Sequence, residues 1–354
     1  MTSVSSNVEV DVFPPIREVE IENFKSIKHL ELECKRINVF IGEPNTGKSN
    51  IIEAIVGFPC SVAYEFKLQN AIRFERLSNL FYDEIIERNI RIDFKKYELV
   101  GILSNCEDLK VALKSNGWTE YELRYYLTRS KKEEKWKWGY PEFYDRKEYE
   151  NISKWLKKFK FYRFRKLNKY PNKSTEFLAP PMGDNLVSVL TKSKELREVA
   201  NNIVSKFGYK LIVKPREDKL EIQKELEEGV VVSFPYTLVS DTIQRIIFYS
   251  AVIHTNKNSV IAMEEPEAHA FPYYTKYLAE LIALDESNQY FITTHNPYFL
   301  LTLIEKTRKE DLAVYITYYE NYQTKAKKLS EKKLQEVLDL GSSAFFNLDV
   351  LMEE

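Results

Sequence analysis

Residues 42–49 read GEPNTGKS, and this stretch decides the fold of the 354-residue chain. It fits the pattern G-x-x-x-x-G-K-S, in which small residues let successive backbone N–H groups close around phosphate oxygens at the start of a helix. A plain surface loop is the alternative interpretation. The flanks favour the phosphate loop, because an apolar run at 37–41 precedes it and a helical pattern at 50–56 follows it.

This pattern predicts a site for the phosphates of a nucleotide and for Mg²⁺. Lys48 is expected to reach the β- and γ-phosphates, and the Ser49 hydroxyl is expected to ligate the metal. The predicted nucleotide contacts are Gly42, Asn45, Thr46, Gly47, Lys48, Ser49 and Asn50.

Three further polar side chains follow apolar runs. Glu264 and Glu265 come directly after the run 260–263, and His295 ends the run 290–294. Alternation lets one carboxylate face the water shell of a metal while its neighbour orients or deprotonates an attacking water. A solvated rim of glutamates and an ordinary polar histidine are the alternatives. Because ligands of open α/β sheets bind at the carboxyl ends of the strands, we expect these groups near the phosphates.

The order of elements predicts an α/β protein. Alternating residues at 17–22 and 29–33 indicate an antiparallel hairpin, and apolar runs separated by helical patterns indicate a parallel sheet. The segment 106–180 is rich in aromatic and basic residues with scattered Gly and Pro, which we interpret as a mainly helical insertion. We therefore expect an N-terminal lobe at 1–105, this insertion, and a C-terminal lobe at 181–354.

Composition narrows the class of protein. Lys and Arg total 52 against 53 Asp and Glu, so the net charge of −1 neither requires nor excludes a polyanionic partner. A hydrophobic fraction of 44% excludes disorder, and three cysteines without C-x-x-C spacing suit neither a disulfide framework nor a zinc site. We predict a cytoplasmic protein without a membrane span, since the longest apolar run is far short of about 20 residues. Abundant Lys, Glu, Ile and Tyr suggest a thermophile.

The segment Lys154–Lys173 contains nine Lys or Arg residues and no acid, interleaved with aromatic residues. This composition is typical of a groove for DNA or RNA, in which cations meet phosphates and aromatic rings stack on bases. Two alternatives stay open. The rings form a core beneath a solvated cationic face, or the segment binds an effector protein.

Five motifs together carry a family resemblance. They are FKS at 24–26, GEPNTGKS at 42–49, LVSDTIQR at 238–245, VIAMEEPEAH at 260–269 and TTHNP at 293–297. In this order they resemble the ABC-type ATPases of the structural-maintenance-of-chromosomes (SMC), Rad50 and RecF class. The chain looks closest to stand-alone AAA-family ATPases related to the overcoming-lysogenisation-defect (OLD) proteins, over about half of its length. The resemblance implies a P-loop NTPase fold, the ABC ATPase head, with a mixed sheet and an antiparallel N-terminal β subdomain.

The resemblance also implies roles for particular residues, with ATP and Mg²⁺ as cofactors. Glu264 takes the Walker B acidic position beside the metal, where relatives usually have Asp. Glu265 takes the position of the catalytic base, and His295 that of the switch histidine. Together with Lys48, Glu265 and His295 are the predicted catalytic residues.

A signature segment is implied at Ser240-Asp241-Thr242, where relatives carry Ser-Gly-Gly or Ser-Asp-Gly. In the family this segment caps the nucleotide held by a second subunit, so Ser240 is a predicted nucleotide contact. Thr242 adds a Cβ where close backbone approach is expected. A helix cap made by Ser240 or Asp241 is a compatible interpretation. Gln69 is the one glutamine between Lys48 and Ile102 that could serve as a Q-loop residue.

These implications lead to one main functional hypothesis. The chain is predicted to hydrolyse ATP, to form a homodimer around nucleotide, and to act in DNA maintenance or defence against mobile DNA. The alternative is a nucleotide-gated scaffold that binds a protein and hydrolyses little. A small-molecule kinase is disfavoured, because the acid pair and His295 have no role in phosphorylating an acceptor. The residues after His295 contain no second acidic pair at a strand end, so we expect no Toprim nuclease domain.

Overall fold

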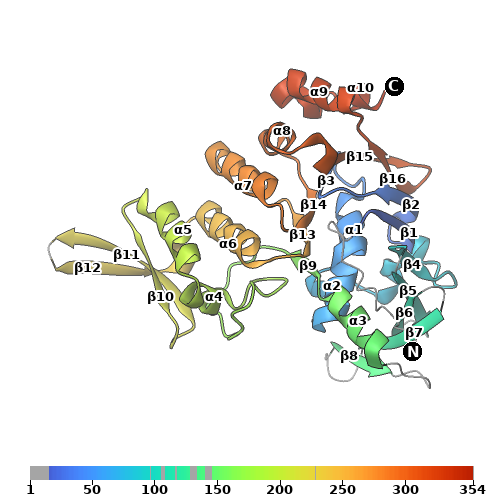
Figure 1. Cartoon of the computed structure of the whole chain (residues 1–354), viewed down its shortest axis with the longest axis horizontal. Coiled ribbons are helices and arrows are strands. Elements are labelled where there is room, and N and C mark those ends of the chain that lie inside the picture. Colours follow the sequence, from blue (N-terminus) through green and yellow to red (C-terminus); the bar gives the residue numbers. More distant parts are fainter. Residues whose placement is uncertain are drawn as a thin grey trace, which may run out of the picture.

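The computed structural model describes residues 16–95, 97–104, 108–115, 118–127, 134–139, 146–227 and 229–353. A six-stranded sheet in the order β16-β15-β3-β14-β13-β9 lies at its centre (Figure 1). Its strands are β3 (Ile37–Gly42), β9 (Phe159–Tyr162), β13 (Val260–Glu264), β14 (Gln289–Thr293), β15 (Leu312–Glu320) and β16 (Gln323–Lys328). Strands β3, β9, β13, β14 and β15 run parallel to one another, and β16 is antiparallel to β15.

Both faces of this sheet are buried, which explains why its parallel strands are continuous apolar runs. Ile37, Val39 and Ile41 of β3 pack with helices on one face, whereas Phe40 packs into a second core on the other face. The first face is covered by α6 (Asp241–Thr255), α7 (Pro272–Leu284) and α8 (Pro297–Lys306). The second is covered by α1 (Lys48–Ile52), the π-helical turn η1 (Glu53–Gly57) and α2 (Phe58–Tyr64).

The N-terminal hairpin predicted from alternation is confirmed as β1 (Glu18–Phe24) and β2 (Ile27–Glu33). Its two-residue turn is Lys25-Ser26, and the hairpin belongs to a seven-stranded antiparallel sheet. Asn23 and Lys25 adopt positive φ angles of 55° and 52°. The sheet order is β2-β1-β4-β5-β6-β7-β8. The remaining strands are β4 (Ile90–Asp93), β5 (Tyr97–Ser104), β6 (Asp108–Ser115), β7 (Trp118–Leu127) and β8 (Glu134–Gly139).

The prediction of a mainly helical insertion at 106–180 is wrong for the described residues. They form β6, β7, β8 and β9, and one helix, α3 (Arg146–Leu156). The physical reason is visible in the sequence of β7, WTEYELRYYL, where every second residue from Thr119 to Leu127 is Thr, Tyr or Leu. That period of two is the signal of a strand, whereas the prediction of helices rests on the composition of the segment.

The aromatic residues of Lys154–Lys173 belong largely to the protein core. Phe159, Phe161 and Tyr162 of β9 are fully buried, and the Trp155 ring packs edge-on against Phe159 with centroids 4.7 Å apart. Buried rings are not accessible to bases, so the structure contradicts base stacking by these residues. The alternative of an aromatic core is confirmed for them. Lys160 is buried too, with its Nζ donating to Asn256 Oδ1 at 2.7 Å.

The C-terminal half begins with two helices. Residues 186–205 form α4 (Leu186–Lys192) and α5 (Lys194–Ser205), followed by a three-stranded sheet. Its strands are β10 (Lys210–Lys214), β11 (Lys219–Glu227) and β12 (Val230–Pro235), and the β11–β12 hairpin projects away from the rest of the molecule (Figure 1). Helices α9 (Glu331–Leu340) and α10 (Leu348–Met352) end the chain. Short 3₁₀ turns lie at Leu68–Asn70, Leu77–Leu80, Tyr82–Glu84, Tyr236–Leu238, Lys309–Asp311 and Gly341–Phe346. Within the described ranges no helix has the length and apolar character to cross a membrane.

The buried position of β9 leads to a stability prediction. We expect Phe161→Ala to lower the free energy of unfolding by about 3–5 kcal/mol, because it leaves a cavity between β9 and the helical segment beside it. Urea denaturation followed by circular dichroism measures this loss. Phe346→Ala is the matched control, since that ring is 88% exposed and its loss should change stability by less than about 0.5 kcal/mol. A Phe161→Ala variant as stable as the control would contradict the core assignment.

Candidate functional site

The loop of residues 42–49 is held in a shape that requires glycine at both ends. Gly42 and Gly47 have φ angles of 144° and 89°. A Cβ on Gly42 would lie 2.3 Å from the Thr317 carbonyl oxygen, and one on Gly47 would lie 2.0 Å from Thr324 Oγ1. Asn45 also has a positive φ, of 63°. The loop therefore needs glycine at positions 42 and 47, because the β15–β16 hairpin leaves no room for a Cβ there.

Lys48 begins α1 and folds back over this loop. Its Nζ donates to the carbonyl oxygens of Gly42 at 2.9 Å and Glu43 at 2.6 Å. Burial lowers its pKa from 10.5 to about 8, although Glu265 and Glu43 act in the opposite direction. The ammonium group thus lies beside the loop that is expected to bind phosphate. The two carbonyl groups that hold it compensate only part of its desolvation.

Hydroxyl groups tie the loop to its neighbours. Thr46 Oγ1 lies 2.7 Å from Thr317 Oγ1 on β15 and donates to the Glu43 carbonyl oxygen at 2.8 Å. Asn50 Nδ2 donates to Ser26 Oγ at 2.7 Å, and Ser26 Oγ lies 2.6 Å from Thr324 Oγ1 on β16. Thus the turn after β1, the helix α1 and the β15–β16 hairpin enclose the loop together.

Glu264 ends β13 and points toward the start of α1. Val260 and Ala262 pack into the core on the α1 face of the sheet, and strand alternation puts Glu264 on that face as well. Ser49 Oγ donates to Glu264 Oε1 at 2.5 Å. Both groups offer oxygen ligands, which is the donor set that Mg²⁺ prefers, so these two residues fit a magnesium site.

Two arginines also bind the Glu264 carboxylate. Arg163, directly after β9, donates to Oε2 through Nε at 3.1 Å and Nη2 at 2.8 Å. Arg73 Nη2 donates to Oε1 at 2.7 Å. Burial opposes ionisation of Glu264, but Arg163, Ser49 and Arg73 outweigh it and lower the pKa of this carboxyl. The carboxylate is therefore ionised at neutral pH.

The same cations surround a second acid, Glu53, that our sequence analysis missed. The Glu53 side chain is 0% exposed and lies 2.5 Å from Lys25 Nζ, 3.2 Å from Arg73 Nε and 3.5 Å from Arg163 Nη2. We call Lys25, Glu53, Arg73, Arg163 and Glu264 the charge cluster. Its members come from five separate places in the sequence, so spacing did not reveal it. The lysine of the FKS motif was the one available signal.

Glu265 and His295 lie together beside the phosphate loop. Glu265 leaves the strand with φ of 42°, and its backbone N–H donates to the Thr293 carbonyl oxygen at 3.0 Å. His295 Nε2 lies 3.5 Å from Glu265 Oε1. Burial and the charge of Lys48 lower the pKa of His295, whereas Glu265 acts to raise it. The Thr294 N–H donates to the Phe40 carbonyl oxygen at 3.2 Å, so the histidine segment lies beside the strand that leads into the phosphate loop and Lys48.

The buried carboxyl group of Glu267 is hydrogen-bonded to the segment that contains His295. Thr294 Oγ1 donates to Glu267 Oε1 at 2.5 Å and accepts from the Asn296 N–H at 3.0 Å. Burial raises the pKa of Glu267 to about 7. Glu267 was not among the predicted site residues, although it lies in the quoted VIAMEEPEAH motif. It touches the backbone that positions His295, which makes it a positioning residue.

The signature segment lies apart from these groups. Ser240 is the N-cap residue of α6, which covers the opposite face of the sheet from α1, and its side chain makes no capping bond. Asp241 Oδ1 lies 2.5 Å from Lys166 Nζ, and Thr242 Oγ1 donates to the His269 carbonyl oxygen at 2.7 Å. Gln69 is exposed on the Leu68–Asn70 turn and lines a hollow with Arg73.

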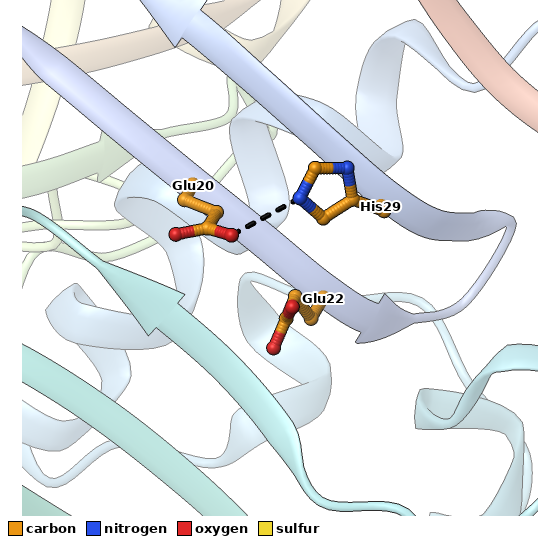
Figure 2. Close-up of side chains that lie close together, drawn as sticks. All are labelled: Glu20, Glu22 and His29. Carbon is orange, nitrogen blue, oxygen red and sulfur yellow. Dashed lines mark hydrogen bonds and ion pairs between the residues drawn. The ribbon is translucent and has the colours of Figure 1, made fainter.

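A further acidic group lies on the outer face of the hairpin. Figure 2 shows Glu20, Glu22 and His29 close together, and His29 Nε2 lies 3.0 Å from Glu20 Oε1. Arg91 Nη1 lies 3.7 Å from Glu20 Oε2 and 3.6 Å from Glu22 Oε2, so a cation already balances these carboxylates. We assign this cluster no role in the site.

Comparison with known proteins identifies the family. Residues 15–228 match the model of the AAA ATPase domain, which covers more than half of the chain. The chain therefore belongs to this family of ATP-binding ATPases, in agreement with its P-loop NTPase fold. A search of curated proteins found no match.

Solved structures of SMC head domains are similar over most of their length. The SMC head domain from Thermotoga maritima is 12% identical with a TM-score of 0.41, covering 89% of this chain and 99% of that chain. An SMC head bound to the C-terminal winged-helix domain of ScpA is 15% identical with a TM-score of 0.49, covering 91% and 99%. An SMC head with an extended coiled coil, bound to the C-terminal domain of ScpA derived from Pyrococcus furiosus, is 14% identical with a TM-score of 0.49, covering 92% and 98%.

The burial of Lys48 predicts a pH-dependent stability difference. Between pH 8 and 10.5 the unfolded chain keeps the Lys48 proton while the folded protein has released it, so the cost of burying this charge is progressively removed and the wild type gains stability as pH rises. Lys48→Met lacks that contribution. We therefore expect the melting temperature of Lys48→Met, relative to wild type, to fall between pH 7.5 and pH 10, measured by calorimetry without nucleotide. Lys194→Met, at a side chain 82% exposed, is the control. A difference for Lys48→Met that does not change with pH would argue against the buried ammonium.

Proposed function

We propose that this protein hydrolyses ATP with Mg²⁺ at the carboxyl ends of β3, β13 and β14. The observation that carries the proposal is the contact of 2.5 Å between Ser49 Oγ and Glu264 Oε1, with Glu265, His295 and Lys48 beside it. This geometry joins the phosphate loop to the acid pair at one edge of the sheet, which is where ligands bind in open α/β folds.

Each residue has a distinct role in this proposal. Lys48 leaves its two carbonyl partners for the β- and γ-phosphates, and Ser49 with Glu264 holds Mg²⁺, which neutralises developing phosphate charge when bound. Glu265 accepts a proton from the attacking water or orients it, since this carboxylate is 44% exposed and faces His295. His295 donates from its ring to the terminal phosphate.

We propose further that two copies of the chain close around ATP. Ser240 lies at the N-terminus of α6 on the other face of the sheet, and in this proposal its side chain meets a nucleotide held by another subunit. Donors at a helix N-terminus suit a phosphate. Thr242 already donates to the His269 carbonyl oxygen, which leaves Ser240 as the available hydroxyl of the segment.

The biological setting in this proposal is cytoplasmic DNA maintenance or defence against mobile DNA, as for the OLD-related ATPases. The exposed cations Lys154, Lys157, Arg165 and Lys169 are the groups of the basic segment that could contact phosphates. Lys166 and Lys173 are already engaged, by Asp241 and Asp218.

Substitution of the proposed base separates nucleotide binding from hydrolysis. We expect Glu265→Gln to bind ATP normally, to lower kcat by roughly 10²–10⁴-fold and to accumulate an ATP-bound dimer, because the proton acceptor is lost and the binding groups stay. Lys48→Ala should lose ATP binding. Phosphate release, calorimetric ATP titration and multi-angle light scattering measure these three properties.

Glu286→Gln is the control for a simple loss of charge, since that side chain is 73% exposed. Unchanged turnover in Glu265→Gln would remove Glu265 from the role of base. A wild-type protein that binds ATP but releases no phosphate in a single-turnover experiment would instead favour the nucleotide-gated scaffold.

The proposed DNA role has its own test. We expect labelled duplex DNA to bind with a log K that falls linearly with log salt concentration, because Lys and Arg release counterions from phosphates. The double variant Lys157→Ala/Lys169→Ala should reduce that slope by about 2, one unit for each phosphate contact. A slope near zero for the wild type would end the nucleic-acid hypothesis while leaving the ATPase proposal intact.

A further inference from the structure

The β15–β16 hairpin rises past the phosphate loop. In the sheet, Leu312 of β15 pairs with Ile37 at the start of β3, and Thr317 pairs with Gly42 at its end. β15 continues for three more residues to Glu320 before the turn at Asn321 and Tyr322. At about 3.3 Å per residue, the hairpin extends roughly 10 Å beyond the edge of the sheet, which is the level of the phosphate loop.

One face of this hairpin touches the loop. Thr317 reaches Thr46 through its hydroxyl, and side chains two residues apart on a strand share a face, so Tyr319 projects from the same face one step higher. Tyr319 pairs with Thr324 of β16, which contacts Ser26. Tyr319 is therefore the next side chain above the hydroxyl groups that enclose the loop.

The rings of Tyr319 and Tyr322 at the end of the hairpin are exposed, whereas hydrogen bonds fix the backbone of the turn. Tyr319 is 53% exposed and Tyr322 is 80% exposed. The Tyr322 carbonyl oxygen accepts from Tyr82 Oη at 3.1 Å and from Tyr319 Oη at 2.9 Å. Two hydroxyl donors thus fix the turn, and the two rings offer apolar faces to a ligand at a place where the backbone is already ordered.

The order of strands indicates what these rings cover. β14 and β13, which lead to His295 and Glu265, lie on one side of β3, whereas β15 and β16 lie on the other side. A nucleotide whose terminal phosphate meets Glu265 must direct its base away from β13, toward the hairpin. We propose that Tyr319 and Tyr322 form the nucleobase subsite of this protein, a further inference that rests on the proposed function.

The chemistry of the pair suits stacking more than hydrogen-bond recognition. The Tyr319 hydroxyl is already bonded to the Tyr322 carbonyl oxygen, so what the pair offers a ligand is chiefly its ring faces. Stacking tolerates any base, because every base has a π face. The subsite therefore discriminates little between bases, with ATP and GTP bound similarly through these two residues.

A comparison of ATP with inorganic tripolyphosphate tests the subsite in the full-length protein. We expect Tyr319→Ala/Tyr322→Ala to bind ATP and GTP at least tenfold more weakly than wild type, the loss expected from removing base stacking. Binding of tripolyphosphate, which has no base, should stay unchanged in the same variant. Isothermal titration calorimetry measures all three ligands. Tyr319→Phe/Tyr322→Phe keeps both rings and should retain ATP affinity within about twofold.

Phe346→Ala is the control for loss of an exposed ring, at 88% exposure. Tyr322→Ala alone, at the more exposed position, guards against misfolding of the double variant, which a thermal melt would reveal. Equal ATP affinity in wild type and in both alanine variants would overturn the subsite. A wild type that binds neither ATP nor tripolyphosphate would contradict the proposed function instead, so the two failures are distinguishable.

Discussion

The register of β3 between β14 and β15 is the constraint on which the whole site depends. Parallel pairing of Thr293 with Phe40, and of Thr317 with Gly42, brings three strand ends to one edge of the sheet. The loop after β3, the histidine after β14 and the hairpin after β15 consequently meet although they are far apart in the sequence. A shift of β3 by one residue would turn each of its side chains to the opposite face of the sheet. It would also separate Glu264 from Ser49.

The charge cluster is the second element that shapes the site. A carboxylate as buried as Glu53 is costly, and here Lys25, Arg73 and Arg163 compensate its charge. The two arginines also bind Glu264. The proposed Mg²⁺ would share the Glu264 carboxylate with Arg73 and Arg163. These arginines already hold the acid in position and balance its charge. Lys48 is held in a similar way, because its ammonium group donates to the carbonyl oxygens of Gly42 and Glu43.

Much of the fold was predictable because its signals are local. The hairpin of β1 and β2, the strand before the phosphate loop and the strands β13 and β14 follow from alternation or from short apolar runs, and the structure confirms them. The strands between 108 and 139 were missed because composition was weighed above period. The central position of β9 was also missed, since a short aromatic run with lysines looks alike in a core strand and in a nucleic-acid groove.

By itself, the sequence determined the phosphate loop, the acid pair and the histidine, because each is a contiguous motif whose chemistry depends on neighbouring residues. Only the tertiary structure decided what surrounds them. Arg163 at the end of β9, Glu53 within the π-helical turn and the tyrosines of the β15–β16 hairpin reach the site through the order of strands in the sheet. That order is set by packing between distant segments, as in the pairing of Thr317 with Gly42, 275 residues apart, and no short stretch of sequence encodes it.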